Sequence, residues 1–108
     1  MAITIDQFKE VEIKVGTVKS AERVPDSDKL LRLEVDLGEG SLRQILSGIA
    51  EYMAPEEMVG RQFPFVTNLE PRVIRGLVSN GMIMAVGEGD TFSLLSPSKT
   101  VQPGSRVR

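Results

Sequence analysis

Short runs in which apolar and polar side chains alternate constrain the fold of this chain more than any other feature. The clearest run covers residues 31–37, where leucine or valine stands at every second position with charged residues between. Side chains of a strand point alternately to its two faces, so this run predicts a strand with one buried face. Residues 11–16 show the same alternation, with valine and isoleucine as the apolar residues. We therefore expect a chain built mainly from half-buried strands.

Glycine and proline mark where the remaining strands begin and end. Gly38-Glu39-Gly40 turns the chain from the second strand into a third, so we expect these two strands to form a hairpin. Pro64 lies inside the fourth strand and implies a sheet edge or a bulge. Residues 87–90 predict a turn after the fifth strand. The predicted strands after residue 37 cover 42–46, 62–67, 81–86 and, as a short addition, 92–95.

Two short helices are predicted outside the strands. Thr4 and Gln7 have the spacing of a capping box, in which each side chain bonds the backbone N–H of the other residue. This helix ends near Glu10 and is too short to persist without docking on another surface. Residues 50–60 contain a proline followed by two glutamates and end at a glycine, which predicts a second short helix between the third and fourth strands.

The order of these elements favours one architecture. Five strands with a small helix between the third and fourth match an OB-fold barrel. A β-sandwich would need more strands, and an SH3-like barrel usually lacks a helix at that place. We therefore expect an all-β protein: a five-stranded OB-fold barrel with a short N-terminal helix and a C-terminal extension, forming a single domain over residues 1–108.

The absence of cysteine and histidine excludes several classes of site. Without them the chain has no disulfide, no thiolate zinc site, and no Ser-His-Asp or Cys-His catalysis. Glu56 and Glu57 are adjacent, so they do not face one another on a helix, and no serine has an evident base. We therefore expect a protein that is not an enzyme and that needs no metal or other cofactor.

No segment of the sequence indicates export or membrane insertion. The first eight residues lack both a basic start and an apolar stretch long enough for a signal peptide. No run approaches the roughly 18 apolar residues that a membrane helix needs. We expect a cytoplasmic protein without a membrane partner.

Two short motifs resemble parts of known ligand loops. Asp26-Ser27-Asp28 has the spacing of a partial calcium loop but lacks the later oxygen ligands, so we expect a turn that leads into the second strand. Gly87-Glu88-Gly89 lacks the third glycine and the following helix of a dinucleotide-binding loop. We interpret it as a hairpin turn.

Positive charge is concentrated in the second half of the chain. Residues 1–59 have a net charge of −5, whereas residues 60–108 have a net charge of +3. The segment between the fourth and fifth strands, which flanks the binding face in OB-folds, is rich in donors suited to phosphates, ribose hydroxyls and base edges. The residues alone also permit an ordinary polar loop with solvated arginines. The donors are Asn68, Arg72, Arg75, Ser79 and Asn80.

Nearly the whole chain resembles the tRNA-binding domain that stands at the C-terminus of many methionyl-tRNA synthetases. The same domain exists as a free-standing, dimeric tRNA-binding protein. No single motif carries the resemblance, but the order and spacing of the motifs over about 100 residues are specific. The matching stretches are residues 5–8, 11–16, 27–31, 43–49, 52–61, 68–72, 79–82 and 94–97.

The resemblance implies a non-catalytic OB-fold that grips the outer corner of tRNA by shape. It also implies a homodimer built through the terminal extensions, either free-standing or attached to a synthetase catalytic domain in the intact protein. By position, the residues it implies as tRNA contacts are Lys29, Arg72, Arg75, Ser79 and Met82, with Asn68 supporting the loop.

The chain departs from the family pattern at three positions. Val73 stands where a lysine is expected, Gly76 where phenylalanine is common, and Asn80 where glutamate is frequent. The missing lysine should weaken phosphate attraction, and the missing acid partly offsets that effect. An alternative is the related CsaA export chaperone, which binds proteins. CsaA differs at residues 47–49 and 79–82, where this chain keeps the tRNA-binding pattern, so the sequence favours RNA.

Overall fold

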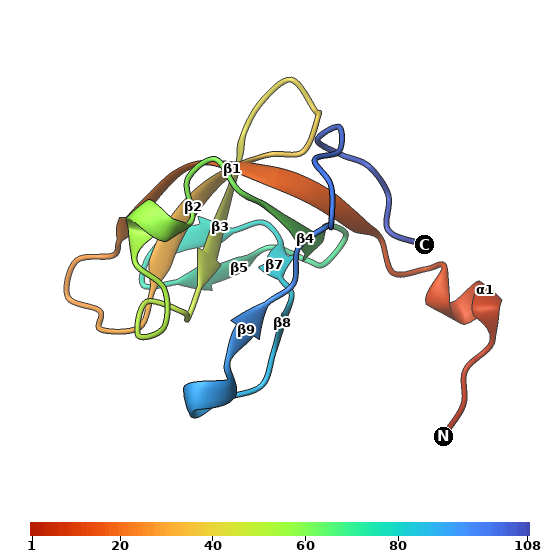
Figure 1. The fold of residues 1–108 in the computed structure, drawn as a ribbon, viewed down its shortest axis with the longest axis horizontal. Helices are drawn as coiled ribbons and strands as arrows, with labels where there is room; N and C mark the ends of the chain where they lie inside the picture. Colours follow the sequence, from red (N-terminus) through yellow and green to blue (C-terminus); the bar gives the residue numbers. More distant parts are fainter.

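The computed structural model describes all of residues 1–108, and its main element is a five-stranded antiparallel sheet. The strand order is β3-β2-β1-β4-β7, and the sheet curls into a nearly closed barrel (Figure 1). The predicted all-β class and five-stranded barrel are confirmed. The strands of this sheet are β1 (Ile13–Arg23), β2 (Leu31–Asp36), β3 (Arg43–Ser47), β4 (Gln62–Val66) and β7 (Met82–Ile83).

The apolar side of the alternating strands fills the barrel. In β2 every second side chain is fully buried, as the sequence pattern predicts. Gly16 of β1 leaves room for this packing, because a Cβ there would lie 2.5 Å from Val35 Cγ1 and 2.9 Å from Leu37 Cδ2. The largest fully buried side chains are Phe63, Phe65, Leu31, Leu33, Leu37, Ile45, Met58, Val18 and Val35.

Strand β1 is longer than the sequence predicts, and it pairs differently along its length. Its first half pairs with β4, and its second half pairs with β2. The register shifts between Val18 and Ser20, which breaks the apolar–polar alternation that the prediction relied on. The expected strand over 11–16 therefore begins at Ile13 and continues to Arg23.

The expectation that Pro64 marks a sheet edge or a bulge is wrong. β4 lies between β1 and β7, and its register with β1 is regular. Pro64 stands opposite Val15 at a position whose backbone groups point away from β1, so no ladder bond is missing there. On the other side its carbonyl accepts from the N–H of Met84, just after β7 ends.

Short hairpins and single helical turns surround the barrel. The hairpins are β5 (Arg72–Ile74) with β6 (Leu77–Ser79), and β8 (Ala85–Val86) with β9 (Ser93–Leu94). The predicted strand over 81–86 is therefore split, at Met84, into β7 and β8. The helix predicted within 50–60 is a single 3-10 turn, η1 (Pro55–Glu57), and a second, η2 (Gly89–Thr91), overlaps the end of the turn predicted over 87–90.

Two turns match their predictions. The Asp26-Ser27-Asp28 stretch turns the chain into β2, and the Ser27 hydroxyl accepts from the N–H of Leu30 at 3.2 Å. Gly87-Glu88-Gly89 connects the paired strands β8 and β9, so it belongs to a hairpin connection.

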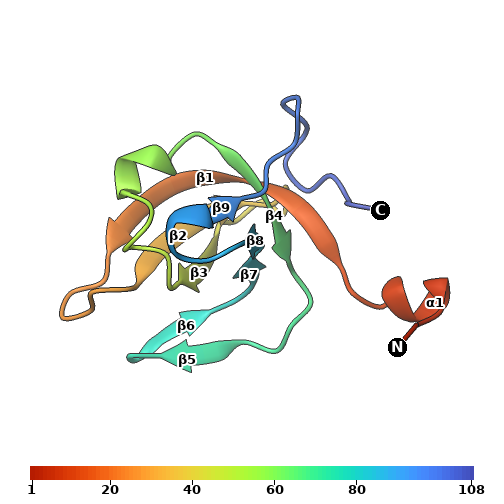
Figure 2. The same ribbon diagram turned by 60° about the horizontal axis from the view of Figure 1, so that its bottom comes forward.

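The two ends of the chain lie at the same end of the molecule (Figures 1 and 2). Helix α1 (Ile5–Phe8) has the predicted capping box, with Thr4 as its N-cap, and none of its residues is buried. The C-terminal residues run beside β1: Val15 donates to Ser105 O and accepts from Gly104 N–H. No helix of the structure has the length and apolar character needed to cross a membrane.

Candidate nucleic-acid interface

The segment expected to be a polar loop between the fourth and fifth strands contains the hairpin β5–β6. Its two central residues, Arg75 and Gly76, have φ angles of 50° and 78°. A two-residue turn with positive φ at both positions is the type I′ geometry that matches the twist of paired strands. The apolar pairs on either side of Arg75-Gly76 are the signal that points to this hairpin, but arginine is an uncommon residue in such a turn.

The two faces of the hairpin differ. Val73 and Val78 stand opposite each other on the outer face, with 72% and 48% of their surface exposed. Arg72 pairs with Ser79, and the pair two positions along, Ile74 with Leu77, shares their face. The hairpin therefore presents Arg75 at its tip and two valines outward, while its other face turns toward the barrel.

Hydrogen bonds fix the hairpin on strand β3. Ser79 Oγ accepts from the backbone N–H of Leu46 at 2.9 Å. Gln44 Nε2 donates to the carbonyl of Val78 at 2.8 Å, and the N–H of Asn80 donates to the carbonyl of Gln44 at 2.8 Å. β6 is thus held on β3 by the Gln44 side chain and by its own serine, since the two strands form no ladder.

Side chains on the outer face of the sheet hold Gln44 in turn. Arg32 Nε donates to Gln44 Oε1 at 2.6 Å, and Arg32 Nη1 lies 2.8 Å from Glu22 Oε1. These interactions run across β1, β2, β3 and β6, so the hairpin is positioned by residues far away in the sequence.

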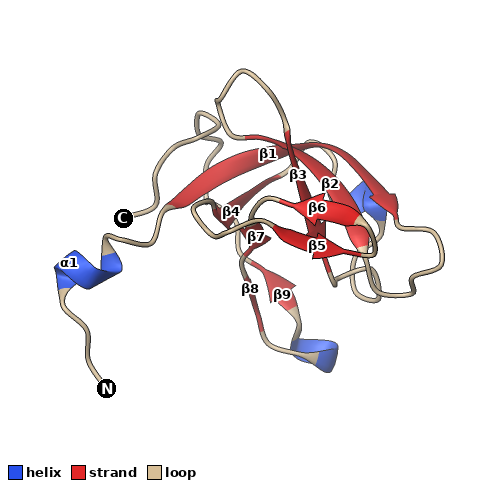
Figure 3. Cartoon of the chain, turned by 180° about the vertical axis from the view of Figure 1, so that it is seen from behind, coloured by secondary structure: helices blue, strands red, loops and turns tan.

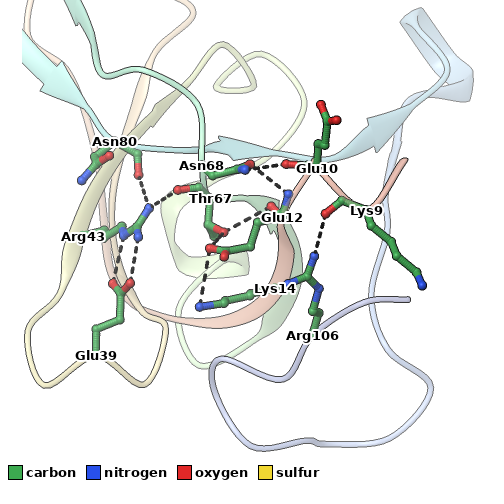
Figure 4. Close-up of polar contacts among 10 residues, drawn as sticks. All are labelled: Lys9, Glu10, Glu12, Lys14, Glu39, Arg43, Thr67, Asn68, Asn80 and Arg106. Carbon is green, nitrogen blue, oxygen red and sulfur yellow. Dashed lines mark hydrogen bonds and ion pairs between the residues drawn. The ribbon is translucent and has the colours of Figure 1, made fainter. Parts of the chain in front are cut away.

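Arg43 closes the base of the hairpin (Figure 4). Its guanidinium forms a two-bond ion pair with Glu39, at 2.9 and 2.7 Å. The same group donates to the carbonyl of Thr67 at 2.6 Å and to that of Asn80 at 3.4 Å. Arg43 therefore joins the two ends of the segment that contains the hairpin.

Asn68, predicted to support the loop, fastens the N-terminal segment to the end of β4 (Figure 4). Its Nδ2 donates to the carbonyl of Glu10 at 2.7 Å, and its Oδ1 accepts from the N–H of Glu12 at 2.9 Å.

The Thr67 hydroxyl donates to Glu12 Oε1 at 2.6 Å. That hydrogen bond lowers the pKa of Glu12 below its ordinary value of 4.5, and Lys14, 3.5 Å away, adds to the effect against the opposing effect of burial.

A pocket of about 90 Å³ lies under the hairpin. It has both apolar and polar walls, and Met82, half of whose surface is exposed, stands at its side. Three of the six predicted site residues line it: Arg72, Ser79 and Met82. The full lining consists of Leu46, Leu69, Glu70, Arg72, Ile74, Ser79, Gly81 and Met82.

The predicted cations are free of intramolecular partners. Lys29, Arg72 and Arg75 are exposed, and none makes an ion pair or a side-chain hydrogen bond. Glu70 pairs with neither arginine. Lys29 lies on the loop between β1 and β2, outside the pocket. That loop is at the same end of the molecule as the β5–β6 turn (Figure 2). Unpaired cations keep their full charge for an anionic ligand.

The structure brings together only part of the predicted set. Arg72, Ser79 and Met82 share the pocket, Arg75 lies at the hairpin tip, Asn68 at its base, and Lys29 stands apart. Sequence reasoning missed Gln44 and Arg43, because their partners lie 34 and 37 positions away in the chain. The two residues are neighbours on β3 and point to opposite faces of the strand, so the alternation alone assigns a partner to neither.

Comparison with known proteins decides the family. Residues 13–106 match the family model described as "Putative tRNA binding domain". The chain belongs to this tRNA-binding domain family. The resemblance seen in the sequence is therefore confirmed, and the hairpin and its pocket lie within the matched residues.

Relatives of the domain include methionine–tRNA ligases of bacteria and archaea. The chain is 51% identical to the methionine–tRNA ligase of Helicobacter pylori over 105 residues, which are 97% of this chain and 16% of the ligase. It is 52% identical to the methionine–tRNA ligase of Methanoregula boonei over 106 residues, which are 98% of this chain and 16% of the ligase. The chain thus spans about a sixth of the length of these curated relatives.

Two solved structures share the fold over the whole chain. A MetRS-related protein from Pyrococcus horikoshii has a TM-score of 0.92 and 37% sequence identity, covering 100% of this chain and 99% of that one. The chaperone CsaA of Bacillus anthracis has a TM-score of 0.88 and 28% identity, covering 100% of both chains.

Proposed function

We propose that this chain is a non-catalytic module that binds tRNA through the hairpin β5–β6 and the pocket beneath it. The observation that carries the proposal is a pair of unpaired arginines, Arg72 and Arg75, on a hairpin that is fixed to the barrel. Because β3 holds the hairpin through Ser79 and Gln44, the arginines are presented at a set place without further ordering.

The proposed contacts divide into two kinds. Arg72, Arg75 and Lys29 contact phosphates, which position the RNA and carry no sequence information. Met82 and the apolar wall of the pocket contact a ribose or base by shape. Ser79 acts by holding the hairpin, because its hydroxyl is already occupied by Leu46 and by the carbonyl of Gly81. A surface of this kind recognises tRNA by its shape rather than by its anticodon.

The relatives support two settings for the module. It acts either as a free-standing tRNA-binding protein or as the C-terminal domain of a methionyl-tRNA synthetase. In a synthetase it would raise the effective concentration of tRNA at a catalytic site that lies elsewhere in the protein. Both settings use the same hairpin and agree with the cytoplasmic location expected from the sequence.

We further propose a homodimer built through the terminal segments. Helix α1 extends away from its own barrel (Figures 1 and 2). Four apolar side chains on and around it are exposed: Ile3, Ile5, Phe8 and Val11. An apolar groove of about 250 Å³ lies near the start of β1 and the end of the chain. A second copy would cover both surfaces and would protect the barrel's edges. The groove is lined by Val15, Pro64, Met84, Leu95, Ser96, Pro97 and Val107.

The likeness to the chaperone CsaA of Bacillus anthracis favours a second candidate, a protein-binding export chaperone. The two functions differ in the ligand that the hairpin surface selects. A chaperone would bind unfolded polypeptide through apolar surface, with weak dependence on salt. A tRNA-binding module loses affinity steeply as salt rises, since bound phosphates release their counterions.

A mobility-shift assay tests the proposal. Total tRNA, an RNA duplex and a single-stranded oligomer of equal charge compete for the protein at fixed ionic strength. We expect tRNA to bind more tightly than either competitor, because only tRNA has the matching outer corner. Equal binding of all three would reduce the function to unspecific charge attraction. Binding of an unfolded polypeptide with no binding of tRNA would favour the chaperone.

A further inference from the structure

A second concave surface, outside the hairpin and its pocket, also concentrates positive charge, and it shares Ser96 and Pro97 with the groove that the proposed dimer would cover. A groove of about 380 Å³ lies between the start of β4 and residues 96–100 of the C-terminal tail. It contains two cations, Arg61 and Lys99, together with four hydroxyl side chains, and no carboxylate lines it. The chain as a whole has 15 acidic residues and a net charge of −2, so this lining is unusual for the molecule. The lining consists of Thr17, Gly60, Arg61, Gln62, Ser96, Pro97, Ser98, Lys99 and Thr100.

Arg61 is held in place without losing its charge. Its Nη1 donates to the carbonyl of Glu57 at 3.2 Å, and its guanidinium carbon lies 5.2 Å from the ring centroid of Phe63. The Glu57 carboxylate is turned away, because it accepts from the N–H of Ala54 at 2.8 Å. A guanidinium has five N–H donors, so most of those of Arg61 are left for a ligand.

Gln62 holds the two walls of the groove together. Its side-chain amide makes two bonds to the backbone of Val101, at 2.7 Å and 3.0 Å. The same Nε2 lies 3.1 Å from Thr17 Oγ1, to which it donates. The tail is thereby tied to β1 and β4, so the groove exists before any ligand arrives.

The remaining polar side chains of the groove have no partner within the protein. Lys99 makes no ion pair, and the side chains of Ser96, Ser98 and Thr100 make no hydrogen bond. Thr17 accepts from Gln62 and keeps its own proton free. Two cations and several hydroxyl donors without a carboxylate fit a compact anion with several acceptor oxygens.

We propose that this surface, the Arg61–Lys99 groove, binds a phosphate group. The phosphate belongs either to the backbone of an RNA or to a small phosphate compound, and the RNA source rests on the proposed function. No residue lines both this groove and the pocket under the hairpin. The hairpin packs on β3 and faces the viewer in Figure 3, whereas the groove lies against β1, β4 and the tail. An RNA phosphate bound here would therefore belong to a different part of the RNA than the part held by the hairpin.

Amide NMR spectra of the intact chain test the groove directly. Inorganic phosphate is titrated at constant ionic strength, balanced with chloride. We expect the amide signals of residues 60–62 and 98–100 to shift, while those of the hairpin stay in place. Lys99→Gln should weaken phosphate binding about tenfold or more, the usual effect of removing a charge-assisted hydrogen bond. Lys19→Gln is the matched control, because Lys19 is an exposed lysine of β1 outside the groove.

A second titration with total tRNA, read as loss of amide signal intensity, distinguishes the two sources. If tRNA weakens the amide signals of the groove and added phosphate prevents that loss, the site is assigned to RNA. If phosphate alone affects these signals, the site is assigned to a small phosphate compound. If neither ligand affects the groove while tRNA affects the hairpin, the groove proposal is overturned and the proposed function stands. If tRNA affects no signal at all, the proposed function fails, and the phosphate titration still decides the groove. Arg61→Lys keeps the positive charge of the groove and should keep phosphate binding. Retained binding in this variant shows that a substitution in the groove does not by itself damage the fold, so the loss in Lys99→Gln comes from the missing charge.

Discussion

The hydroxyl oxygen of Ser79 and the backbone N–H of Leu46 form a hydrogen bond of 2.9 Å between two buried residues. It joins the hairpin β5–β6 to strand β3, although the two belong to different sheets. The arginines of the hairpin are exposed, but the group that places them is hidden beneath it. Stability and RNA binding should therefore respond together when this bond is removed.

Replacing Ser79 by alanine should lower the free energy of unfolding by about 1–3 kcal/mol, because the buried N–H of Leu46 loses its acceptor. Urea unfolding measures this decrease. The same variant should bind tRNA more weakly, since the hairpin is no longer fixed. Ser93→Ala is the control: Ser93 is exposed, and its hydroxyl contacts only the carbonyl of Leu94 at 3.4 Å. Equal stability of the two variants would show that the Ser79 bond contributes nothing.

The double variant Arg72→Ala, Arg75→Ala should keep its stability within about 0.5 kcal/mol, because both side chains are exposed and unpaired. Its tRNA affinity should fall, and the slope of log K against log salt should decrease by about one for each phosphate that the protein no longer binds. Lys19→Ala removes an exposed cation elsewhere and serves as the comparison. An unchanged slope in the double variant would move the search for the interface to Lys14 and Lys29.

Arg75→Asn separates the geometry of the turn from its charge. Arg75 has a φ of 50°, a conformation that asparagine adopts more readily than arginine, and Asn-Gly is the favoured pair in this type of turn. We expect the variant to be as stable as the parent or more stable by a few tenths of a kcal/mol. Its tRNA binding should nevertheless weaken. Thermal unfolding and a mobility shift on the same sample measure both effects, and a decrease in stability would contradict the turn geometry.

Acid should destabilise the protein partly through Glu12. Its pKa is lower in the folded state than its ordinary value of 4.5, chiefly because of the Thr67 hydroxyl. The unfolded chain therefore takes up the proton first as pH falls. The contribution of Glu12 to the stability of the folded state is fully present above about pH 4.5 and is lost as pH falls through its folded-state pKa.

Unfolding free energies measured from pH 7 downward check this prediction. Glu12→Gln should flatten the loss of stability below pH 4.5. Thr67→Val should flatten it as well, because it removes the main donor to the carboxylate while keeping the side-chain shape. A variant curve parallel to that of the parent would assign the acid sensitivity to other carboxylates.

Light scattering at micromolar concentration should give about twice the chain mass of 11.8 kDa. Phe8→Asp should shift the protein toward the monomer, because a charge would have to be buried in an apolar contact. Val73→Asp places the same charge on an exposed valine of the hairpin and should leave the mass unchanged. A monomeric parent at this concentration would remove the dimer from the proposed function.

The sequence predicts those parts of the fold whose determinants are local. The alternation in residues 31–37 identifies β2, and the pair Thr4 and Gln7 identifies the cap of α1. The hairpin β5–β6 is missed because its Arg75-Gly76 turn lacks the usual Asn-Gly signal. Pro64 is misplaced because the direction of its missing N–H depends on the strand register, which no single segment determines.

The candidate site shows the same division. Arg72 and Arg75 can be named from the chain because they are donors on a connecting segment, whereas Met82 is named only through the family resemblance. The burial of Ser79 cannot be predicted from the chain, since its partner Leu46 stands 33 positions earlier. The Arg61–Lys99 groove is equally hidden, because it forms only where Gln62 meets Val101, 39 positions later.

The backbone bonds between β1 and the end of the chain also have a consequence for synthesis. Val15 finds its partners in Gly104 and Ser105, and Ile13 finds its partner in Val107. A ribosome that adds about 5–20 residues per second needs roughly 5 to 20 seconds to make the intervening chain. During that interval this edge of β1 has no neighbour, and an open edge is a template on which another nascent chain can pair. The domain is therefore most exposed to aggregation just before its last residues are made.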